Sequence, residues 1–321
     1  MKLIVQIPCY NEEEILPQTV RDIPREIPGI DKIEVLVIDD GCSDRTVEVA
    51  REIGVDHVLS NTQNIGLARS FRRGLEHCVR LGADIIVNTD ADNQYVGEDI
   101  AKLVKPVLEG QADIVVGDRQ TSKIQHFSPL KKLLQRFGSG VVRRLAGVHV
   151  PDTVSGFRAF SRAAAIKLNI VSPFSYTIET VIQAGKRDIA VLSVPIRTNP
   201  KTRESRLFKS IPDFITRQAS TIIRMYAMYQ PLRVFFAIGV LFSLIGIIPI
   251  ARFVYFFLLG AGDGHIQSLV LGGVFVMLGA MSFLIGLVAD LISFNRQLLE
   301  MILEKIKQAE FDEQEKEGTE G

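Results

Sequence analysis

Acidic and amide side chains recur in three short segments of the sequence, each directly after an apolar, β-branched run. The segments are Pro8-Cys9-Tyr10-Asn11-Glu12, Asp39-Asp40-Gly41 and Asp90-Ala91-Asp92-Asn93-Gln94. If the runs are parallel strands, their carboxyl ends meet at one edge of a sheet. Carboxylates that face one crevice repel each other unless a cation lies between them, and hard divalent ions bind oxygen ligands and share substrate phosphates. The pattern therefore predicts a site for a divalent cation and a phosphorylated substrate.

A helix cap is the alternative explanation for any one of these acidic turns. Ser43 or Asp44 stands just before a helix that we expect at Thr46, and either residue type suits that role. Capping alone does not explain acidic turns after three strands, so we favour a shared site.

The residues around these segments alternate between short β-branched runs and helical stretches. We expect strands at Leu3–Ile7, Glu34–Asp39, His57–Leu59, Ile85–Asn88, Ile114–Gly117 and Ile189–Val194, and helices at Pro17–Arg25, Thr46–Ile53, Leu67–Leu81 and Glu98–Glu109. Such alternation predicts an α/β domain, with a mostly parallel sheet and helices on both of its faces.

Two long apolar stretches near the C-terminus differ in kind from these elements. The first is Val234–Ala251, which continues after Arg252 as far as Leu259, and the second is Ile266–Ala289. Each is long enough to cross about 30 Å of hydrocarbon at about 1.5 Å per helical residue. We therefore predict a transmembrane hairpin with spans at about 234–259 and 266–291. Arg252 lies near the end of the first span, where its side chain can reach the outer headgroups.

Basic residues flank the two predicted spans, whereas the turn between them has no Lys or Arg. They are Arg217, Arg224 and Arg233 before the first span, and Arg296, Lys305 and Lys307 after the second. Lys and Arg favour the cytoplasmic side, so the N-terminal domain and the C-terminal tail are expected in the cytoplasm. The first residues form a strand-like run without a basic region or a cleavage site, so no signal peptide is expected.

Charge and cysteine content argue against other classes of protein. The net charge is zero, but acidic residues gather in residues 310–321, which leaves the rest mildly basic. A nucleic-acid-binding protein would carry a dense basic stripe, so we expect no such partner, and we expect the acidic tail to be disordered. The three cysteines lie far apart, which indicates a reducing compartment and neither a metal cluster nor a disulfide framework. No Gly-x-Gly-x-x-Gly follows the first strand, which excludes a Rossmann dehydrogenase.

Four segments resemble, in order, the successive motifs of the family 2 glycosyltransferases. They are Pro8-Cys-Tyr-Asn-Glu-Glu13, Asp39-Asp-Gly-Cys-Ser-Asp-Arg-Thr46, Asn64-Ile-Gly-Leu-Ala68 and Asp90-Ala-Asp-Asn-Gln94, within a match over about residues 1–200. The resemblance implies the Rossmann-like GT-A fold and a nucleotide-diphosphate sugar as donor. It also implies Mg²⁺ or Mn²⁺ held by Asp90, Asp92 and Gln94. The donor-binding residues that it implies are Pro8, Tyr10, Asn11, Glu12, Asp39, Asp40, Asp90, Ala91, Asp92, Arg119, Arg203 and Arg206.

Within that family the chain is similar to the polyprenyl-phosphate glycosyltransferases, such as dolichol-phosphate mannose synthase and the bacterial undecaprenyl-phosphate glucosyltransferases. Asp152-Thr-Val-Ser-Gly-Phe-Arg158 is similar to their Asp-x-x-Ser-Gly-Phe-Arg segment. Arg203-Glu-Ser-Arg206 resembles a shorter form of their Arg-x-Gly-Glu-Ser-Lys segment, without the Gly and with Arg for Lys. A C-terminal pair of spans is also a common anchor in the group. The resemblance implies that Arg136 and Ser139 bind the phosphate of a polyprenyl phosphate acceptor.

Apolar and basic residues interleave at helical spacing in Phe127–Leu145. A basic amphipathic helix suits a membrane interface, and an ordinary surface helix is the alternative. A second amphipathic stretch, Phe208–Tyr229, leads into the first span. The expected layout is a catalytic domain at 1–206 with an interface helix at about 127–146, a juxtamembrane helix at 207–231, the hairpin at 232–295 and a charged tail at 296–321.

A lipid phosphate would be an anionic nucleophile, because its second pKa is near 6, and it would need little help from a base. The enzyme must then stabilise the charge that develops on the leaving diphosphate. We assign this role to Asp92 with the metal, to Arg119 and to Arg203. Asp152 positions the acceptor, acts as base or is a structural hydrogen-bond acceptor, and Glu179 is a weaker candidate base. The expected reaction is inverting transfer of a hexose from a UDP-glucose or GDP-mannose type donor.

Two alternatives to this reaction remain, and a third is disfavoured. A hydroxyl acceptor on a glycolipid or saccharide would make Asp152 or Glu179 an obligatory base. A non-catalytic scaffold that binds nucleotide sugars would not need both Asp90 and Asp92. A processive polysaccharide synthase is disfavoured, because the chain has no Trp for a Gln-x-x-Arg-Trp motif and only two predicted spans. The sequence is compatible with a homo-oligomer.

Overall fold

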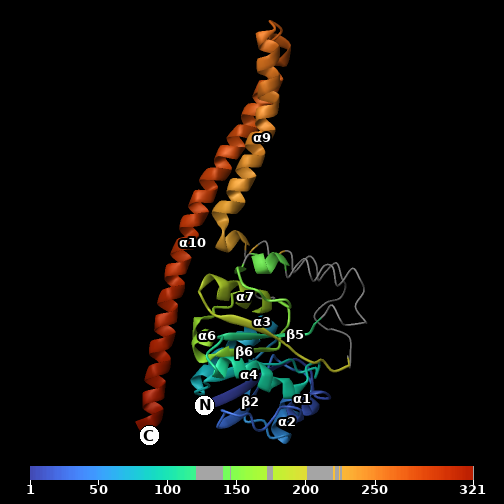
Figure 1. The fold of residues 1–321 in the computed structure, drawn as a ribbon, viewed down its shortest axis with the longest axis vertical. Coiled ribbons are helices and arrows are strands. Elements are labelled where there is room, and N and C mark those ends of the chain that lie inside the picture. The colour runs from blue at the N-terminus through green and yellow to red at the C-terminus, as the bar shows by residue number, and fades with distance from the viewer. Residues whose placement is uncertain are drawn as a thin grey trace. The chain divides into compact units, whose positions relative to one another are not determined.

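The computed structural model describes residues 1–120, 140–144, 146–171, 176–200, 220, 224 and 226–320. The chain divides into two compact units. One unit comprises Met1–Ile222 together with Glu304–Gly321, and the other comprises Ile223–Leu303. Figure 1 shows the fold as a ribbon and labels several elements of each unit.

The first unit is built on a mixed sheet, which has seven strands among the described residues. These are β1 (Lys2–Cys9), β2 (Lys32–Asp39), β3 (His57–Ser60), β4 (Ile85–Asn88), β5 (Ile114–Asp118), β6 (Arg158–Ser161) and β7 (Val191–Pro195). Their order in the sheet is β3-β2-β1-β4-β6-β5-β7. β6 runs antiparallel to β4 and β5, and the other pairings are parallel. The predicted mostly parallel sheet is confirmed.

Helices cover both faces of this sheet. They are α1 (Leu16–Arg21), α2 (Thr46–Glu52), α3 (Leu67–Arg80), the 3-10 turn η1 (Gly97–Asp99), α4 (Ile100–Leu108), α6 (Arg162–Lys167) and α7 (Tyr176–Lys186). Val5 and Ile7 of β1 share one buried apolar cluster with residues of α1 and α4. Gln6 points to the opposite face, where Gly74 of α3 lies against Gln6 and Ile38. The central strands are therefore covered on both faces, as is typical of a parallel sheet.

Most element bounds lie close to those expected from the sequence. β7 begins at Val191 rather than Ile189, and the helix expected at Glu98–Glu109 begins as η1 and continues as α4. Neither β6 nor α6 was predicted, and α7 was expected only as a helix that carries Glu179. β6 has only four residues, and one of them is Arg158, which in a sequence indicates an exposed loop rather than a strand.

The second unit contains α9 (Pro231–Leu258), the 3-10 turn η2 (Asp263–His265) and α10 (Ile266–Glu320) as far as Leu303. By length and composition both helices could cross a membrane, yet only 11% and 17% of their most apolar windows are buried. A core helix of a soluble protein would bury most of its apolar side chains. Apolar composition with this exposure indicates membrane association, as expected for the hairpin.

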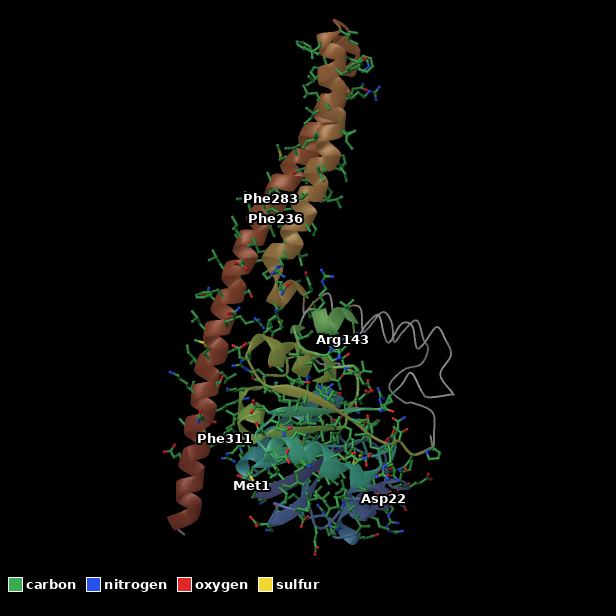
Figure 2. The ribbon with its side chains drawn as sticks, viewed as in Figure 1. Met1, Asp22, Arg143, Phe236, Phe283 and Phe311 are labelled. Carbon is green, nitrogen blue, oxygen red and sulfur yellow. The ribbon has the colours of Figure 1, made fainter. Side chains whose placement is uncertain are left out.

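α9 and α10 approach each other closely at small residues. A Cβ atom added at Gly239 would lie 2.7 Å from the ring of Phe283, and one added at Gly246 would lie 2.7 Å from the carbonyl oxygen of Gly272. The rings of Phe236 and Phe283 meet nearby, with centroids 5.2 Å apart (Figure 2). Small residues let apolar helices pack backbone to backbone, so these glycines hold the hairpin together.

The acidic tail is helical, and the expectation that it is disordered was wrong. α10 continues to Glu320, and its residues from Glu304 belong to the first unit. Arg187 Nη2 donates to Glu304 Oε2 at 2.7 Å, and Lys307 Nζ donates to Glu76 Oε1 at 3.2 Å. The side chain of Phe311 is only 4% exposed. Ion pairs and one buried aromatic ring therefore hold this part of the helix in the first unit.

Candidate active site

Three strand ends lie side by side at one edge of the sheet. β2, β1 and β4 are parallel neighbours, with Cys9 in register with Asp39 and Gln6 in register with Asn88. The parallel pattern continues past the strands, because the Asp40 amide donates to the Cys9 carbonyl at 2.9 Å. The predicted meeting of the three acidic segments at one sheet edge is confirmed.

The first two segments are interlocked by hydrogen bonds. Asn11 has a left-handed backbone, with φ at 56°, which Asn adopts more readily than most residues. Its Oδ1 accepts from the Ser43 amide at 2.8 Å, and its amide donates to Cys42 Sγ at 3.2 Å. The Glu12 amide donates to Thr46 Oγ1 at 2.8 Å. The chain after β1 is thus fixed on the chain after β2.

The predicted donor-binding residues of these segments differ in exposure. Tyr10 is 44% exposed, whereas Glu12 and Asp39 are buried at 9% and 6%. Pro8 is buried within β1, and Asp39 Oδ1 accepts from the Cys42 amide at 2.7 Å. Tyr10 is therefore the most exposed of these residues, while Asp39 and Pro8 shape the strand ends. Their contacts with a donor stay predictions.

Asp40 is only 4% exposed, and its carboxylate accepts hydrogen bonds from several protein groups. Oδ1 accepts from Asn61 Nδ2 at 3.0 Å, from the Ile65 amide at 2.9 Å and from Ser70 Oγ at 2.8 Å, and Oδ2 accepts from the Gly66 amide at 3.0 Å. These bonds fix the turn before α3, where Gly66 has φ at 90°. The structure gives Asp40 a role in building this turn, and its contact with a donor stays a prediction.

Capping explains Asp44, an acidic residue just after the second segment. Asp44 Oδ1 accepts from the Thr46 amide at 3.0 Å, and its Oδ2 accepts from the Glu13 amide at 3.2 Å. Asp44 thus satisfies an amide at the start of α2, as the capping alternative predicts.

Asp90 and Asp92 follow β4 in a turn that protein contacts hold in place. Asp92 Oδ1 accepts from the Gln94 amide at 3.1 Å, and the Ala91 carbonyl accepts from Thr19 Oγ1 at 2.9 Å. Loss of solvation, reinforced by the neighbouring carboxylate of Asp92, raises the pKa of Asp90 to about 7. Two carboxylates that disfavour each other's charge form a site that a cation would stabilise.

Arg119 and Asp152, both predicted to be catalytic, form a buried ion pair. Arg119 Nε donates to Asp152 Oδ2 at 2.7 Å and Nη2 donates to Oδ1 at 3.0 Å, a two-pronged contact. The side chains are 15% and 1% exposed. Burial alone would lower the pKa of Arg119, but the carboxylate of Asp152 more than offsets this, and the pKa is raised. Arg119 also opposes the rise in the pKa of Asp90, so its charge acts on the acidic turn.

A buried polar group behind the acidic turn was missed by the sequence analysis. Asn88 Nδ2 donates to the Gly156 carbonyl at 2.9 Å and to Tyr176 Oη at 3.0 Å. The Gly156 amide donates to Tyr95 Oη at 3.1 Å. Two signals were available, since Gly156 is the glycine of the Ser-Gly-Phe-Arg motif and Tyr95 directly follows Gln94.

Glu179 lies on α7 and is fully buried. Its Oε1 accepts from the Val171 amide at 3.1 Å and from Gln183 Nε2 at 3.2 Å, which ties α7 to the segment before it.

Four predicted site residues, Arg136, Ser139, Arg203 and Arg206, lie outside the described residues, as do most of the two predicted amphipathic stretches. Their roles stay predictions.

The possible metal ligands at the acidic turn suit a cation that is also bound by a substrate. In the described part of the chain, no group of three or more His, Cys, Asp or Glu side chains could hold a metal ion alone. Mg²⁺ typically uses one or two carboxylates and completes its shell with waters and substrate phosphates. The carboxylates of Asp90 and Asp92 supply that number.

Two curated relatives share most of their length with this chain. The UDP-N-acetylglucosamine–dolichyl-phosphate N-acetylglucosaminyltransferase of Methanococcus voltae is 31% identical over 216 residues, which cover 60% of this chain and 83% of that protein. The undecaprenyl-phosphate mannosyltransferase of Micrococcus luteus is 28% identical over 206 residues, which cover 61% and 83%.

A solved structure has the same fold. It is glucosyl-3-phosphoglycerate synthase from Mycobacterium tuberculosis in complex with Mn²⁺, UDP and phosphoglyceric acid, with a TM-score of 0.54 at 20% identity over 70% of this chain and 77% of that one. The same enzyme has also been solved with Mg²⁺ and UDP. The likeness shows that the first unit has the GT-A fold.

The family comparison agrees with both results. The profile of Glycosyl transferase family 2 matches residues 4–168, more than half of the chain. The match includes all three acidic segments, Arg119 and the Asp152–Arg158 motif. The chain therefore belongs to glycosyltransferase family 2, and it is a glycosyltransferase.

Proposed function

We propose that this enzyme transfers a hexose from a nucleotide-diphosphate sugar to a polyprenyl phosphate at the cytoplasmic face of a membrane. The names of both relatives specify a lipid phosphate of this type, which supports the acceptor. The two exposed apolar helices support the membrane location. The single observation that carries the choice of acceptor is the buried Arg119–Asp152 pair.

A hydroxyl acceptor needs a base that takes its proton during attack. Asp152 is the first candidate for that base, but Arg119 donates to both of its oxygens. Protonation of Asp152 would leave a buried guanidinium without its counter-ion, which is costly. A lipid phosphate is already anionic at neutral pH, because its second pKa is near 6. The pair therefore favours a phosphate nucleophile over a hydroxyl.

The reaction is a single displacement at the anomeric carbon of the sugar. A phosphate oxygen of the lipid attacks from the side opposite the nucleoside diphosphate, and a new carbon–oxygen bond forms. The bond to the diphosphate breaks, and its electron pair leaves with the nucleoside diphosphate. Arg119 places positive charge near the acidic turn, and Asp152 holds Arg119 in position. Arg203 is proposed to add a second positive charge to the leaving group.

Asp90 and Asp92 are the residues that would hold Mg²⁺ or Mn²⁺, with Gln94 as a further ligand. When bound, the ion would neutralise the charge that develops on the leaving diphosphate. The raised pKa of Asp90 beside Asp92 supports this assignment, as does the presence of Mn²⁺ or Mg²⁺ with UDP in structures of the same fold.

The proposal is limited to a hexose. The two relatives are similar to this chain to nearly the same degree, at 31% and 28% identity, but the name of one specifies N-acetylglucosamine and that of the other mannose. A panel of UDP and GDP sugars is therefore the appropriate donor set.

The decisive experiment compares acceptors that differ in the attacking group. Membranes containing the full chain are incubated with radiolabelled UDP and GDP sugars and with polyprenyl phosphate, the matching polyprenol or diacylglycerol. We expect label only in the polyprenyl phosphate product, and we expect mild acid to release it, as for a sugar phosphodiester. Label on polyprenol or diacylglycerol, in a product that resists mild acid, would overturn the proposed acceptor.

A further inference from the structure

Asn199 lies shortly after β7 in the sequence and contacts the backbone of the acidic turn. Its amide donates to the Gln94 carbonyl at 2.9 Å, and its Nδ2 donates to the Asn93 carbonyl at 2.9 Å. A carbonyl can only accept, so both bonds have fixed roles. Asn199 therefore holds two successive carbonyls of the acidic turn, one through its backbone and one through its side chain.

The chain around Asn199 is itself anchored in the first unit. Arg197 donates to Asp99 Oδ1 through Nε at 3.0 Å and through Nη2 at 2.7 Å, and its amide donates to Oδ2 at 2.6 Å. Asp99 is fully buried and belongs to η1. Between these bonds and those of Asn199, Thr198 forms an antiparallel bridge with Tyr95. Asn199 is therefore presented to the acidic turn by a segment that is fixed on both sides of Thr198.

The acidic turn has an unusual backbone that contacts from two directions stabilise. Asn93 has a left-handed backbone, with φ at 52°, which is uncommon for residues other than glycine. Its Nδ2 donates to Oδ2 of Asp22 at 3.1 Å, at the end of α1 (Asp22 is labelled in Figure 2). Thr19 Oγ1, also on α1, donates to the Ala91 carbonyl at 2.9 Å. The turn is therefore held by α1 and by Asn199.

We infer that Asn199 is a positioning residue, which keeps the backbone of the acidic turn in the shape that binds the diphosphate of the donor. The inference rests on the proposed role of Asp92 and Gln94 at the donor, and it assigns no contact between Asn199 and substrate. A site that is ordered before its ligand arrives avoids the entropic cost of ordering on binding. Loss of the Asn199 side chain should therefore weaken donor binding and leave acceptor binding unchanged.

Asn199→Ala tests this inference, because it removes the bond from Nδ2 and keeps the backbone amide. Asn199→Leu is a second variant, which keeps the approximate size and the neutral charge of the side chain but cannot donate. Thr198→Ala is the matched control, since Thr198 is the neighbouring residue, is also half-buried and bridges Tyr95 through its backbone.

Three measurements on the purified full chain separate positioning from a general loss of stability. Isothermal titration calorimetry gives the dissociation constants of UDP and of GDP in the presence of Mn²⁺, without turnover. Hydrogen exchange of the amides at 93–96 reports the order of the turn in the metal-free protein. Circular dichroism gives the melting temperature, and initial rates give the KM for polyprenyl phosphate.

We expect both Asn199 variants to raise the dissociation constant of the nucleotide that the wild type binds by about three- to tenfold, the range that one net hydrogen bond supports. Exchange at 93–96 should be faster than in the wild type before any ligand is added. The KM for polyprenyl phosphate should stay unchanged, and Thr198→Ala should match the wild type in every measurement.

Wild-type nucleotide affinity in the Asn199 variants, an equal loss of affinity in Thr198→Ala, or failure of both Asn199 variants to fold would overturn the inference and leave the proposed function standing. A lower melting temperature with unchanged nucleotide affinity would indicate a purely structural role and would also overturn it. A wild-type enzyme that binds neither UDP nor GDP would overturn the inference together with the proposed donor. A failed acceptor comparison would overturn only the acceptor.

Discussion

At the strand ends, the positive charge of Arg119 is paired with the carboxylate of Asp152. Arg119 donates to both carboxylate oxygens of Asp152, while loss of solvation and the neighbouring carboxylate of Asp92 raise the pKa of Asp90 to about 7. The spacing of the acidic residues predicted this concentration of charge. The Arg119–Asp152 pair was not predictable from pattern, because the two residues are far apart in the sequence and each was assigned a separate role.

The metal assignment predicts that Asp92→Asn lowers turnover by roughly 100-fold or more, the scale for loss of one group that stabilises developing charge. Asp44→Asn is the matched control, because it removes one negative charge from a neighbouring segment and leaves an oxygen that can cap α2. Chelation with EDTA should abolish transfer by the wild type, and Mg²⁺ or Mn²⁺ should restore it. Full activity in excess EDTA would contradict the assignment.

The charge of the nucleophile gives a second prediction at this scale. Asp152→Asn should retain measurable turnover, with an unchanged pH profile above about pH 7, where a lipid phosphate is largely dianionic. Arg136→Ala should raise the KM for polyprenyl phosphate about tenfold or more, which is the scale of a lost charge-assisted hydrogen bond. Initial rates over lipid concentration and pH measure both effects, with circular dichroism as the check on folding. Nearly inactive Asp152→Asn and Glu179→Gln, with a wild-type KM in Arg136→Ala, would indicate a hydroxyl acceptor.

Among the elements, those with a repeating apolar pattern were predictable and those built on a buried charge were not. β1, β2 and β4 are apolar runs covered on both faces, which the sequence displays directly. β6 contains Arg158, which is fully buried and donates to the carbonyls of Thr153, Ser155 and Thr177. Burial lowers the pKa of Arg158 to about 10, so it stays charged at neutral pH. A charged residue that usually marks the surface here joins the Asp152 segment to α7.

A second charge cluster, at the amino-terminal end of the strands, predicts how stability depends on pH. Glu34 of β2 contacts Lys2 of β1 at 2.7 Å, Lys32 at 2.6 Å and His57 of β3 at 2.8 Å. Burial raises the pKa of Glu34, but these hydrogen bonds outweigh it and lower the pKa from 4.5 to about 2. A lowered pKa in the folded state stabilises the fold above the ordinary pKa, and this contribution is lost as the pH falls.

We therefore expect the melting temperature of the full chain to decrease as the pH is lowered from about 4.5 to about 2, because Glu34 becomes protonated. Glu34→Gln should be less stable than the wild type at pH 7 and should approach it at the low end of this range. Circular dichroism is the suitable probe, because the chain has no Trp. Glu52→Gln, on an exposed side chain, is the control. Parallel curves for the wild type and Glu34→Gln would contradict the prediction.

The whole molecule combines two units that follow opposite rules of burial. The first unit buries its apolar strands, whereas α9 and α10 leave most of their apolar side chains exposed, as suits contact with lipid. The apolar runs predicted where the hairpin lies, but they did not predict that α10 continues to Glu320. Helix geometry does not end where apolar composition ends, and the pairs Arg187–Glu304 and Glu76–Lys307 depend on residues distant in sequence. The orientation across the membrane stays a prediction of the flanking charges.

Cysteine labelling of intact cells can test that orientation on a nearly silent background. Cys9 and Cys78 are buried and Cys42 is partly buried. Burial raises the pKa of Cys42 to about 12, and a protonated thiol reacts poorly. New cysteines are placed at Gly264, where an added Cβ meets nothing within 4 Å, and at exposed Glu310. Both sites therefore offer a reactive thiol without disturbing the fold.

The positive-inside rule predicts that Gly264→Cys reacts with an impermeant maleimide added to intact cells. Glu310→Cys should react only after the membrane is permeabilised, because the tail then lies on the cytoplasmic side. The wild-type chain should stay unlabelled in both conditions. Label on Glu310→Cys in intact cells would place the tail outside. Because Glu304–Gly321 belongs to the same compact unit as the strand-end site, that result would also separate the site from cytoplasmic nucleotide sugars and contradict the proposed location of the reaction.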